Sequence, residues 1–135
     1  MPERRPDRVT GGAHDEFWRH CADGELWFQR CSRCALWQWP TAADECCERC
    51  GGGTVWHPVS GRGRVIGQCV FERAYYQELS VPYETILVEL DEGPLFISNP
   101  CGFRADQAVG AAVCVAFLDC TDQAGAFRLP VFELS

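Results

Sequence analysis

Two short cysteine motifs decide the fold of this chain, Cys31-Ser32-Arg33-Cys34 and Cys47-Glu48-Arg49-Cys50. In each motif two residues separate the cysteines, which lets a tight turn point both sulfurs at one metal ion. Zinc in structural sites takes four ligands in a tetrahedron, and the two motifs supply four thiolates. We therefore expect one structural Zn²⁺, which holds the first half of the chain together, with the ligands Cys31, Cys34, Cys47 and Cys50.

Two other side chains and one other metal are alternatives to this ligand set and to zinc. Cys46 precedes Cys47 directly, but the two-residue spacing favours Cys47 as the partner of Cys50. His57 is a weaker candidate ligand, since an ordinary strand or surface histidine is more common. Iron of rubredoxin type would use the same four sulfurs and carry electrons. Zinc is favoured over iron, because Cys34 is followed by Ala35 where a rubredoxin-like turn would have glycine.

Length and composition indicate a small protein of the cytoplasm. The chain has 135 residues, 47% of them hydrophobic, which is enough for one ordinary domain or for a metal module beside a compact β domain. The first eight residues have no apolar core, so we expect no secretory signal, and no apolar run is long enough to span a membrane. Without a secretory signal, ten cysteines indicate metal binding and not a disulfide framework.

The charged residues exclude some classes of function. The formal net charge is −7, and four thiolates would make it more negative, so the surface repels a nucleic-acid backbone unless the basic residues are segregated. All twelve basic residues are arginine, which excludes lysine Schiff-base chemistry and lysine general bases. Arginine remains suited to forked contacts with carboxylate or phosphate.

The first half of the chain is expected to be an arm, a short helix and a zinc ribbon. Residues 1–13 are polar with prolines and glycines, which predicts a flexible arm. A helix is predicted over residues 14–23, with Gly24 as its cap, and its Phe17 and Trp18 must pack on the chain's own ribbon or barrel, which we favour, or on a partner. Strands are predicted at 25–30, 36–39 and 55–57, around a loop at 41–45, with Trp37 and Trp39 on one face. The helix and ribbon together take residues 14–58.

The second half, residues 59–135, is expected to be a five-stranded OB-fold barrel. Strands are predicted at 63–71, 84–90, 95–98, 112–118 and 126–132, with a hairpin turn at Asp91-Glu92-Gly93. Five short strands with glycines at the bends suit a small closed barrel better than a sandwich. Pro130 indicates an edge position or a bulge in the last strand. Cys69, Cys114 and Cys120 are expected to be small buried residues. The fold class is thus mainly β.

Few residues outside the cysteine motifs carry candidate chemistry. No nucleophile motif and no helical pair of metal-binding histidines is present, so no catalytic residue is expected. Arg62 and Arg64 lie beside Gly61, Gly63 and Gly67, but this glycine spacing is wrong for a dinucleotide loop, so a bend into a strand is expected. The segment 73–83 is long for a hairpin, and its Tyr75 and Tyr76 make it either a binding loop or a lid over the barrel end.

Several motifs together resemble a known family. They run from residue 17 to residue 94 and are Phe17-Trp18, Gly24-Glu25-Leu26, Arg30-Cys31-Ser32-Arg33-Cys34, Trp39-Pro40, Cys47-Glu48-Arg49-Cys50-Gly51, Val59-Ser60-Gly61-Arg62-Gly63, Val81-Pro82-Tyr83 and Val88-Glu89-Leu90-Asp91-Glu92-Gly93-Pro94. The pattern resembles the bacterial and archaeal family of OB-fold proteins with an N-terminal rubredoxin-like zinc ribbon, a family long labelled a domain of unknown function. The resemblance covers nearly everything after residue 14. The sequence departs from the family pattern at Ala35, where glycine is common, and at the doubled Cys46-Cys47.

The resemblance implies an accessory role in lipid or steroid metabolism. Members of the family accompany thiolase-like acyl-CoA enzymes, such as acyltransferases, synthases and side-chain aldolases, and the partner carries the catalytic residues. We therefore expect a non-catalytic subunit of a hetero-oligomer, with acyl-CoA as a further candidate ligand. Candidate CoA contacts are Arg62, Arg64 and Arg73, and candidate partner contacts are Phe17, Trp18, Trp37, Trp39, Tyr75 and Tyr76.

The sequence is compatible with two other functions. Ribbon and OB modules often bind single-stranded nucleic acid, and the aromatic residues for it are available, but the acidic charge and the missing lysines argue against it. A rubredoxin-like electron carrier would require iron at the four cysteines.

Overall fold

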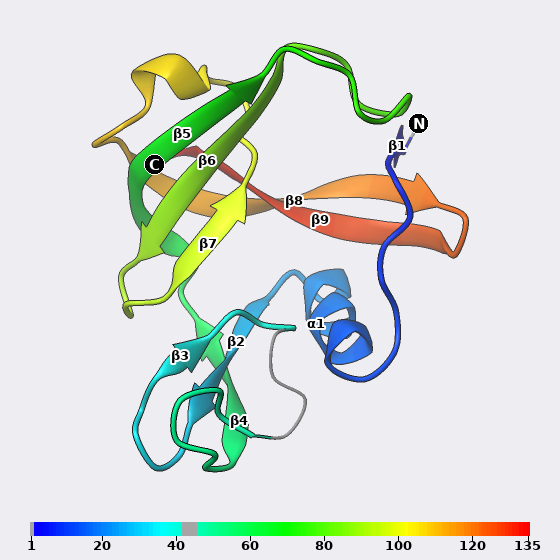
Figure 1. Ribbon diagram of the computed structural model, residues 1–135. Coiled ribbons are helices and arrows are strands. Elements are labelled where there is room, and N and C mark those ends of the chain that lie inside the picture. The colour runs from blue at the N-terminus through cyan, green and yellow to red at the C-terminus, as the bar shows by residue number, and fades with distance from the viewer. Residues whose placement is uncertain (1, 42–45) are drawn as a thin grey trace.

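The computed structural model describes residues 2–41 and 46–135, and within them the chain is mainly β, as expected (Figure 1). The loop expected at 41–45 lies, apart from Thr41, outside the described residues. None of the described helices has the length and apolar character to cross a bilayer. The elements are β1 (Glu3–Arg4), α1 (Ala13–Ala22), β2 (Leu26–Cys31), β3 (Trp37–Gln38), β4 (Thr54–Val59), β5 (Arg62–Phe71), β6 (Tyr83–Leu90), β7 (Leu95–Ser98), the 3₁₀ turn η1 (Ala105–Gln107), β8 (Ala112–Asp122) and β9 (Gly125–Leu134).

The front half contains the expected helix and three-stranded ribbon. α1 begins and ends within one residue of its predicted bounds, and Gly24, with φ of 74°, turns the chain from the helix into β2. β2 is the central strand, with β3 and β4 antiparallel on its two sides. β4 is longer than expected, since it pairs with β2 from Thr54 opposite Cys31 to Val59 opposite Leu26.

The back half is a five-stranded barrel. β5 pairs with β6 and β8, β6 pairs with β7, and β8 pairs with β9. The barrel closes at one point, where Pro100 bridges Phe132 of β9 in the parallel direction. There the N–H of Phe132 donates to the carbonyl of Asn99 at 3.1 Å, and the N–H of Cys101 donates to the carbonyl of Phe132 at 2.7 Å. These pairings agree with the OB-fold barrel predicted from the strand pattern.

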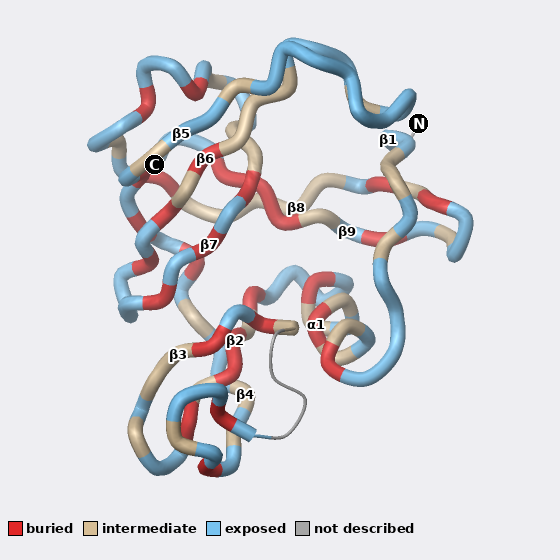
Figure 2. The backbone as a smooth tube through the Cα atoms, viewed as in Figure 1, coloured by how far each residue is buried: buried red, intermediate tan, exposed pale blue. Residues whose placement is uncertain are grey.

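The hairpin of β5 and β6 extends beyond the barrel (Figure 1). The register between these strands shifts between Val65 and Gly67, and the far end of the hairpin is largely exposed (Figure 2). Cys69 lies on this outer part and is exposed, so the prediction that it is buried is wrong. Cys114 is half-buried, and Cys120 is buried as expected.

The helix, the ribbon and the barrel share one apolar core around Phe96 of β7. The Phe96 ring lies 6.3 Å from Phe17 of α1, 5.6 Å from Phe28 of β2 and 6.2 Å from Phe132 of β9, measured between ring centroids. Trp39 stacks on the same ring at 4.9 Å. Aromatic pairs at these separations attract beyond their burial of apolar surface. Phe17 therefore packs on the chain's own ribbon and barrel, which is the alternative favoured from the sequence.

The N-terminal segment differs from the expected flexible arm. Glu3 and Arg4 form β1, which pairs in parallel with β8, and the backbone N–H of Arg5 donates to the carbonyl of Thr121. We call residues 3–9 the N-terminal strap. The sequence did not indicate this attachment, because two residues are too few to show a strand pattern.

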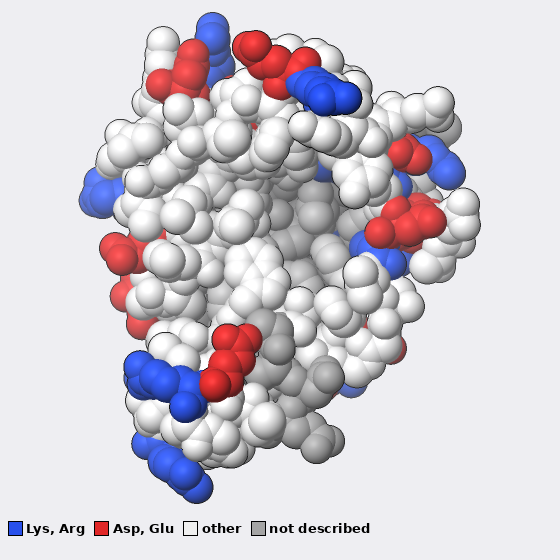
Figure 3. Space-filling model, in the orientation of Figure 1, with Lys and Arg blue, Asp and Glu red and all other residues white. Residues whose placement is uncertain are grey.

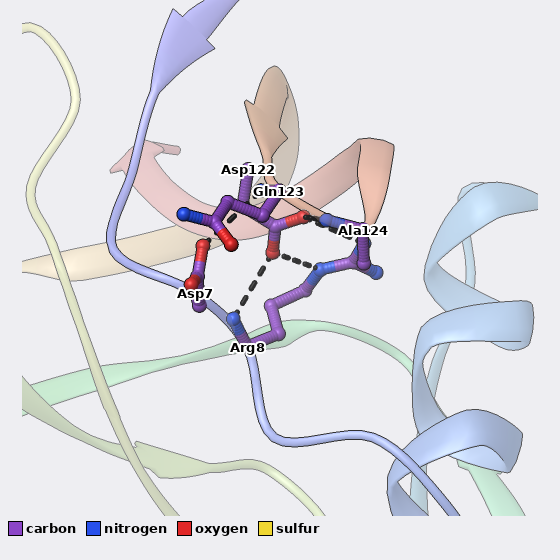
Figure 4. A network of polar contacts seen from close by, with 5 residues as sticks. All are labelled: Asp7, Arg8, Asp122, Gln123 and Ala124. Carbon is purple, nitrogen blue, oxygen red and sulfur yellow. Dashed lines mark hydrogen bonds and ion pairs between the residues drawn. The ribbon is translucent and has the colours of Figure 1, made fainter.

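An ion pair between Arg8 and Asp122 holds the lower part of the strap (Figure 4). The Nε of Arg8 donates to Asp122 Oδ2 at 2.7 Å, and the backbone N–H groups of Arg8 and Ala124 donate to the two carboxylate oxygens. The Arg8 guanidinium also lies 4.1 Å from the ring centroid of Phe127. The hydrogen bonds from Arg8 lower the pKa of Asp122 to about 2, against the desolvation that would raise it.

Replacing this carboxylate should destabilise the fold. We expect Asp122→Asn to lower the free energy of unfolding by about 2 kcal/mol at neutral pH, because hydrogen bonds to a charged group are lost. Urea denaturation measures the change. Asp119→Asn is the matched control, since Asp119 is 77% exposed and 3.6 Å from Arg128, and exposed pairs contribute about 0.5 kcal/mol.

The effect should depend on pH with a defined sign. The folded pKa of Asp122 lies below its unfolded value, so the stabilisation is present above about pH 4 and is lost as the pH falls towards about pH 2. The stability difference between wild type and Asp122→Asn should therefore shrink over that interval. A difference that stays constant with pH, or equal losses in the two variants, would contradict this role.

Candidate metal centre and the surfaces around it

The sulfurs of the two cysteine motifs meet at one point. The Sγ atoms of Cys31, Cys34, Cys47 and Cys50 all lie within 4.8 Å of one another. Cys31 and Cys50 are 3.5 Å apart, and Cys34 and Cys47 are 3.7 Å apart, between sulfurs. Sulfurs at about 2.3 Å from a tetrahedral zinc lie about 3.8 Å from one another. The cluster thus fits a metal ion, and zinc is compatible with it.

The two turns supply N–H groups to the sulfurs. The backbone N–H groups of Arg33 and Cys34 donate to Cys31 Sγ at 3.4 and 3.3 Å. In the second turn the N–H of Arg49 donates to Cys47 Sγ at 3.4 Å, and the N–H of Gly52 donates to Cys50 Sγ at 3.4 Å. Such hydrogen bonds favour the thiolate form, which is the form that binds metal.

The surroundings of two thiols, Cys31 and Cys34, lower their pKa values. The backbone N–H of Leu36 and the Arg49 guanidinium lower the pKa of Cys34 to about 6. The pKa of Cys31 is lowered as well, chiefly by the N–H of Cys34. A bound cation would favour ionisation of all four sulfurs, since a metal deprotonates a coordinating thiol. A site with four thiolate ligands leaves no position for water and is of the structural kind.

The competing ligands lie elsewhere. Cys46 is exposed and forms an isolated bridge with Gly53, and its sulfur is not part of the described cluster. His57 lies on β4, where its ring meets the edge of Trp37 at 6.1 Å between centroids. The structure therefore brings together the four cysteines chosen from the spacing, and neither alternative ligand joins them.

Gln38 is a part of the site that sequence reasoning missed. Its Nε2 donates to Cys47 Sγ at 3.4 Å and to the carbonyl of Leu36 at 3.2 Å, and the side chain is buried. The alternation of side chains along β3 could have predicted the position of Gln38. Trp37 and Trp39 flank Gln38, so Gln38 must point to the opposite face.

The candidate aromatic contacts separate into core and surface residues. Phe17 is buried in the core, and Trp18 packs against Phe127 with ring centroids 5.3 Å apart. Trp37 is half-buried and contacts Phe28. The remaining three candidates are exposed, namely Trp39 at 40%, Tyr75 at 68% and Tyr76 at 56%.

The three candidate arginines do not converge on one place. Arg62 and Arg64 lie at the start of β5, where Arg62 is 3.9 Å from Asp91 and Arg64 donates to the carbonyl of Gly110. Arg73 follows the other end of β5 and lies over the ring of Tyr75 at 5.7 Å. A strand of ten residues spans about 30 Å. One phosphate group cannot contact all three.

The segment 73–83 surrounds a hollow at the tip of the β5–β6 hairpin. The hollow has a volume of about 320 Å³. It is apolar and aromatic, with Arg73 as its charged member, and its lining residues are Phe71, Arg73, Ala74, Tyr75, Tyr76, Leu79, Val81 and Tyr83. Because this hairpin end projects from the barrel, the segment is a surface feature of the kind expected for a binding loop.

Metal content should distinguish the adjacent cysteines. We expect the purified chain to contain one zinc ion, and Cys47→Ser to lose it and to unfold the ribbon, because metal binding and folding are coupled. Cys46→Ser is the control and should retain the metal, since Cys46 lies outside the cluster. Elemental analysis and thermal unfolding provide the two readouts. Loss of metal in Cys46→Ser with retention in Cys47→Ser would assign the ligand to Cys46.

Ala35 should limit the stability of the first turn. Its φ of 62° lies in the left-handed region, which costs a residue with a Cβ about 1–2 kcal/mol. We expect Ala35→Gly to raise the free energy of unfolding of the metal-bound chain by about 1 kcal/mol. Ala112→Gly, in the exposed first position of β8, should instead lower it. An Ala35→Gly protein less stable than wild type would show that the turn is not strained.

Known proteins are similar to this chain over different parts of its length. A family profile described as "ChsH2, C-terminal OB-fold domain" matches residues 56–118. A curated "Probable enoyl-CoA hydratase alpha subunit" from Thermomonospora curvata is 31% identical over 136 residues, or 98% of this chain. The chain spans only 41% of the length of that relative.

A solved structure matches nearly the whole chain. Its description is "Ltp2-ChsH2(DUF35) aldolase", and the matched chain is 25% identical, with a TM-score of 0.76. The match covers 95% of this chain and 98% of the other. The cysteine cluster, the five-stranded barrel and these similarities agree with the family indicated by the sequence motifs. The chain is thus similar to the ChsH2 (DUF35) proteins, in its OB-fold region by the family profile and over nearly its whole length by the solved structure.

Proposed function

We propose that this chain is a non-catalytic accessory subunit of a thiolase-like complex that processes acyl-CoA, such as an acyltransferase, a synthase or a side-chain aldolase. The observation that carries the proposal is the similarity to the chain from the Ltp2–ChsH2(DUF35) aldolase over 95% of this chain. The catalytic residues would lie on the thiolase-fold partner, in the cytoplasm and in a pathway of lipid or steroid metabolism.

The cysteine cluster supports a structural role for the metal. We assign Cys31, Cys34, Cys47 and Cys50 to one Zn²⁺, which would fix the two turns and therefore the direction of β3. The two candidate domains, residues 14–58 and 59–135, would then act as one rigid body, because both contribute to the core around Phe96.

Exposed aromatic residues are the proposed partner contacts. Trp39, Tyr75 and Tyr76 offer large apolar surface that a partner would desolvate, and such residues often contribute most to binding. They lie in two places, beside the core at β7 and at the tip of the β5–β6 hairpin. For CoA, Arg73 at the hairpin tip and the pair Arg62 and Arg64 are alternative phosphate contacts, because they lie at opposite ends of β5.

The relative from Thermomonospora curvata favours a second candidate. Its name assigns it to an enoyl-CoA hydratase, another enzyme that acts on acyl-CoA. The match covers 41% of that relative, so the module formed by this chain is only part of the larger protein there. A module of this kind could serve a hydratase as an accessory surface in the same way. Under this candidate the catalytic partner is a hydratase and not a thiolase.

Co-purification should test both candidates. We expect the tagged chain, co-expressed with the thiolase-fold protein encoded nearest to it, to retain that protein through gel filtration at micromolar concentration. Omitting the chain should reduce the acyl-CoA turnover of the partner. A neighbouring enoyl-CoA hydratase subunit is the parallel arm, and binding there but not to the thiolase would favour the second candidate.

Controls separate this function from nucleic-acid binding and electron transfer. A chain that stays alone with both enzymes, yet shifts a single-stranded oligonucleotide in a salt-dependent way, would exclude an accessory role and favour nucleic-acid binding. Red iron-loaded protein with a reversible visible spectrum would favour an electron carrier.

A further inference from the structure

β7 is an edge strand with one open side. It pairs with β6 from Ile86 opposite Ser98 to Glu89 opposite Leu95. On its other side the described residues close the barrel only at Asn99 to Cys101, which meet Phe132 of β9. Within β7 itself, two side chains cross this gap: the hydroxyl of Ser98 donates to the carbonyl of Pro130 at 2.8 Å, and the ring of Phe96 packs on Phe132. The rest of the β7 edge has no strand beside it in the described parts of the chain.

The backbone groups on this open side can be identified. The N–H of Leu90 donates to the carbonyl of Pro94, and hydrogen-bonded pairs alternate along antiparallel strands. Phe96 and Ser98 therefore bond to β6, and the N–H and C=O groups of Leu95 and Ile97 point to the open side. The carbonyl of Asn99, next in this series, faces the same side and accepts from Phe132, which agrees with the assignment.

The side chains on this edge do not protect it. Proteins usually block an open edge with charged residues, proline or a bulge, because a row of free N–H and C=O groups pairs readily with another chain. β7 carries no charged residue, and Leu95 and Ile97 are 46% and 60% exposed. An apolar, unprotected edge of this kind is suited to pairing with a strand from another chain.

A hollow lies beside the edge. We call it the seam groove; it has a volume of about 250 Å³ and runs between β7, β9, α1 and the ribbon. Trp39 and Phe96 form part of its wall, and Ile97 and Pro130 stand on its two sides. Its described lining carries no Asp, Glu or Arg, although the chain has a net charge of −7. Figure 3 shows a hollow in the centre of one face whose walls are mostly white, with the charged side chains mainly around it.

We propose that an extended, uncharged and apolar segment of the enzyme partner pairs with the open edge of β7 as an added strand. The inference rests on the proposed function, because it names the surface by which the accessory subunit binds its enzyme. The segment's backbone would bond to Leu95 and Ile97, and its alternate side chains would enter the seam groove beside Trp39. A charged segment would lose hydration in the groove without gaining a counter-ion.

The chemistry of the edge favours a peptide over an acyl chain. An acyl chain would fill the seam groove equally well as an apolar body. It has no donors or acceptors for the N–H and C=O groups of Leu95 and Ile97, so it would bury them unpaired or leave them in water. An extended peptide satisfies both requirements together.

Substitutions at Ile97 should test the site in the whole complex. We expect Ile97→Lys to weaken binding of the co-purifying enzyme at least about tenfold, because a lysine at an open edge prevents strand pairing. Val109→Lys is the matched control, since Val109 is 63% exposed and lies outside the seam groove. It should bind as wild type does. Retained zinc and an unchanged circular dichroism spectrum would show that both variants fold.

A second pair of variants should isolate the backbone bond. Ile97→Pro removes the outward N–H at a position where an edge strand tolerates proline, and it should also weaken binding about tenfold. Ile97→Val keeps the N–H and should bind nearly as tightly as wild type. In addition, the amides of Leu95 and Ile97 should exchange at least about tenfold more slowly in the complex than in the free chain.

The outcomes separate this inference from the proposed function. If wild type binds the enzyme and Ile97→Lys and Ile97→Pro bind equally well, the strand site is wrong and the accessory role stands. If wild type binds neither enzyme, both proposals fail. Saturable quenching of tryptophan fluorescence by a long-chain acyl-CoA alone that Trp39→Phe abolishes, without protection of the Leu95 and Ile97 amides in the complex, would assign the groove to an acyl chain. Concentration-dependent dimers that Ile97→Lys abolishes would assign the edge to a second copy.

Discussion

The convergence of four sulfurs is the constraint on which the front half of the molecule depends. β2 and β4 have six residues each and β3 has two, and so small a sheet is marginal by itself in water. The N–H groups of both turns point at sulfur, so the turns are fully hydrogen-bonded only when each cysteine keeps its place. A metal ion at that point would join two turns that are distant in sequence, and would thereby set the direction in which β3 leaves the site.

The metal-binding turns act on the rest of the protein through Trp39. This residue follows β3, and its ring stacks on Phe96, which is also in contact with Phe17, Phe28 and Phe132. A change in the cysteine site would therefore reach β7 through packed aromatic rings, because a close-packed core transmits displacement. This gives a closed metal site a consequence at a distance, since the surface beside β7 is formed jointly by the ribbon, the helix and the barrel.

The elements with a regular local pattern could be predicted from the sequence, and the long-range attachments could not. The cysteine spacing predicted the four sulfurs that lie together, and local patterns with glycine turns predicted the helix and the strands to within a few residues. The ion pair between Arg8 and Asp122 joins residues 114 positions apart and leaves no local signal. Cys69 was misplaced because β5 continues past its bulge and out of the barrel, so an inward-pointing position there has no core to face. The open edge of β7 could not be predicted from the sequence either, because it exists only where β7 and β9 do not pair along their length.

An unprotected edge strand can pair with another copy of the same chain and cause aggregation, and most proteins avoid it. The net charge of this chain reduces that risk. Each copy has a formal net charge of −7, and the repulsion between two such chains opposes self-association of the kind that open edges invite. The same repulsion does not act on a neutral or basic partner. The net charge of the chain therefore disfavours a second copy at the apolar edge, while the backbone groups of Leu95 and Ile97 stay available to a different protein. This selectivity needs no charged residue within the site itself, which agrees with the described lining of the seam groove, where no Asp, Glu or Arg is found.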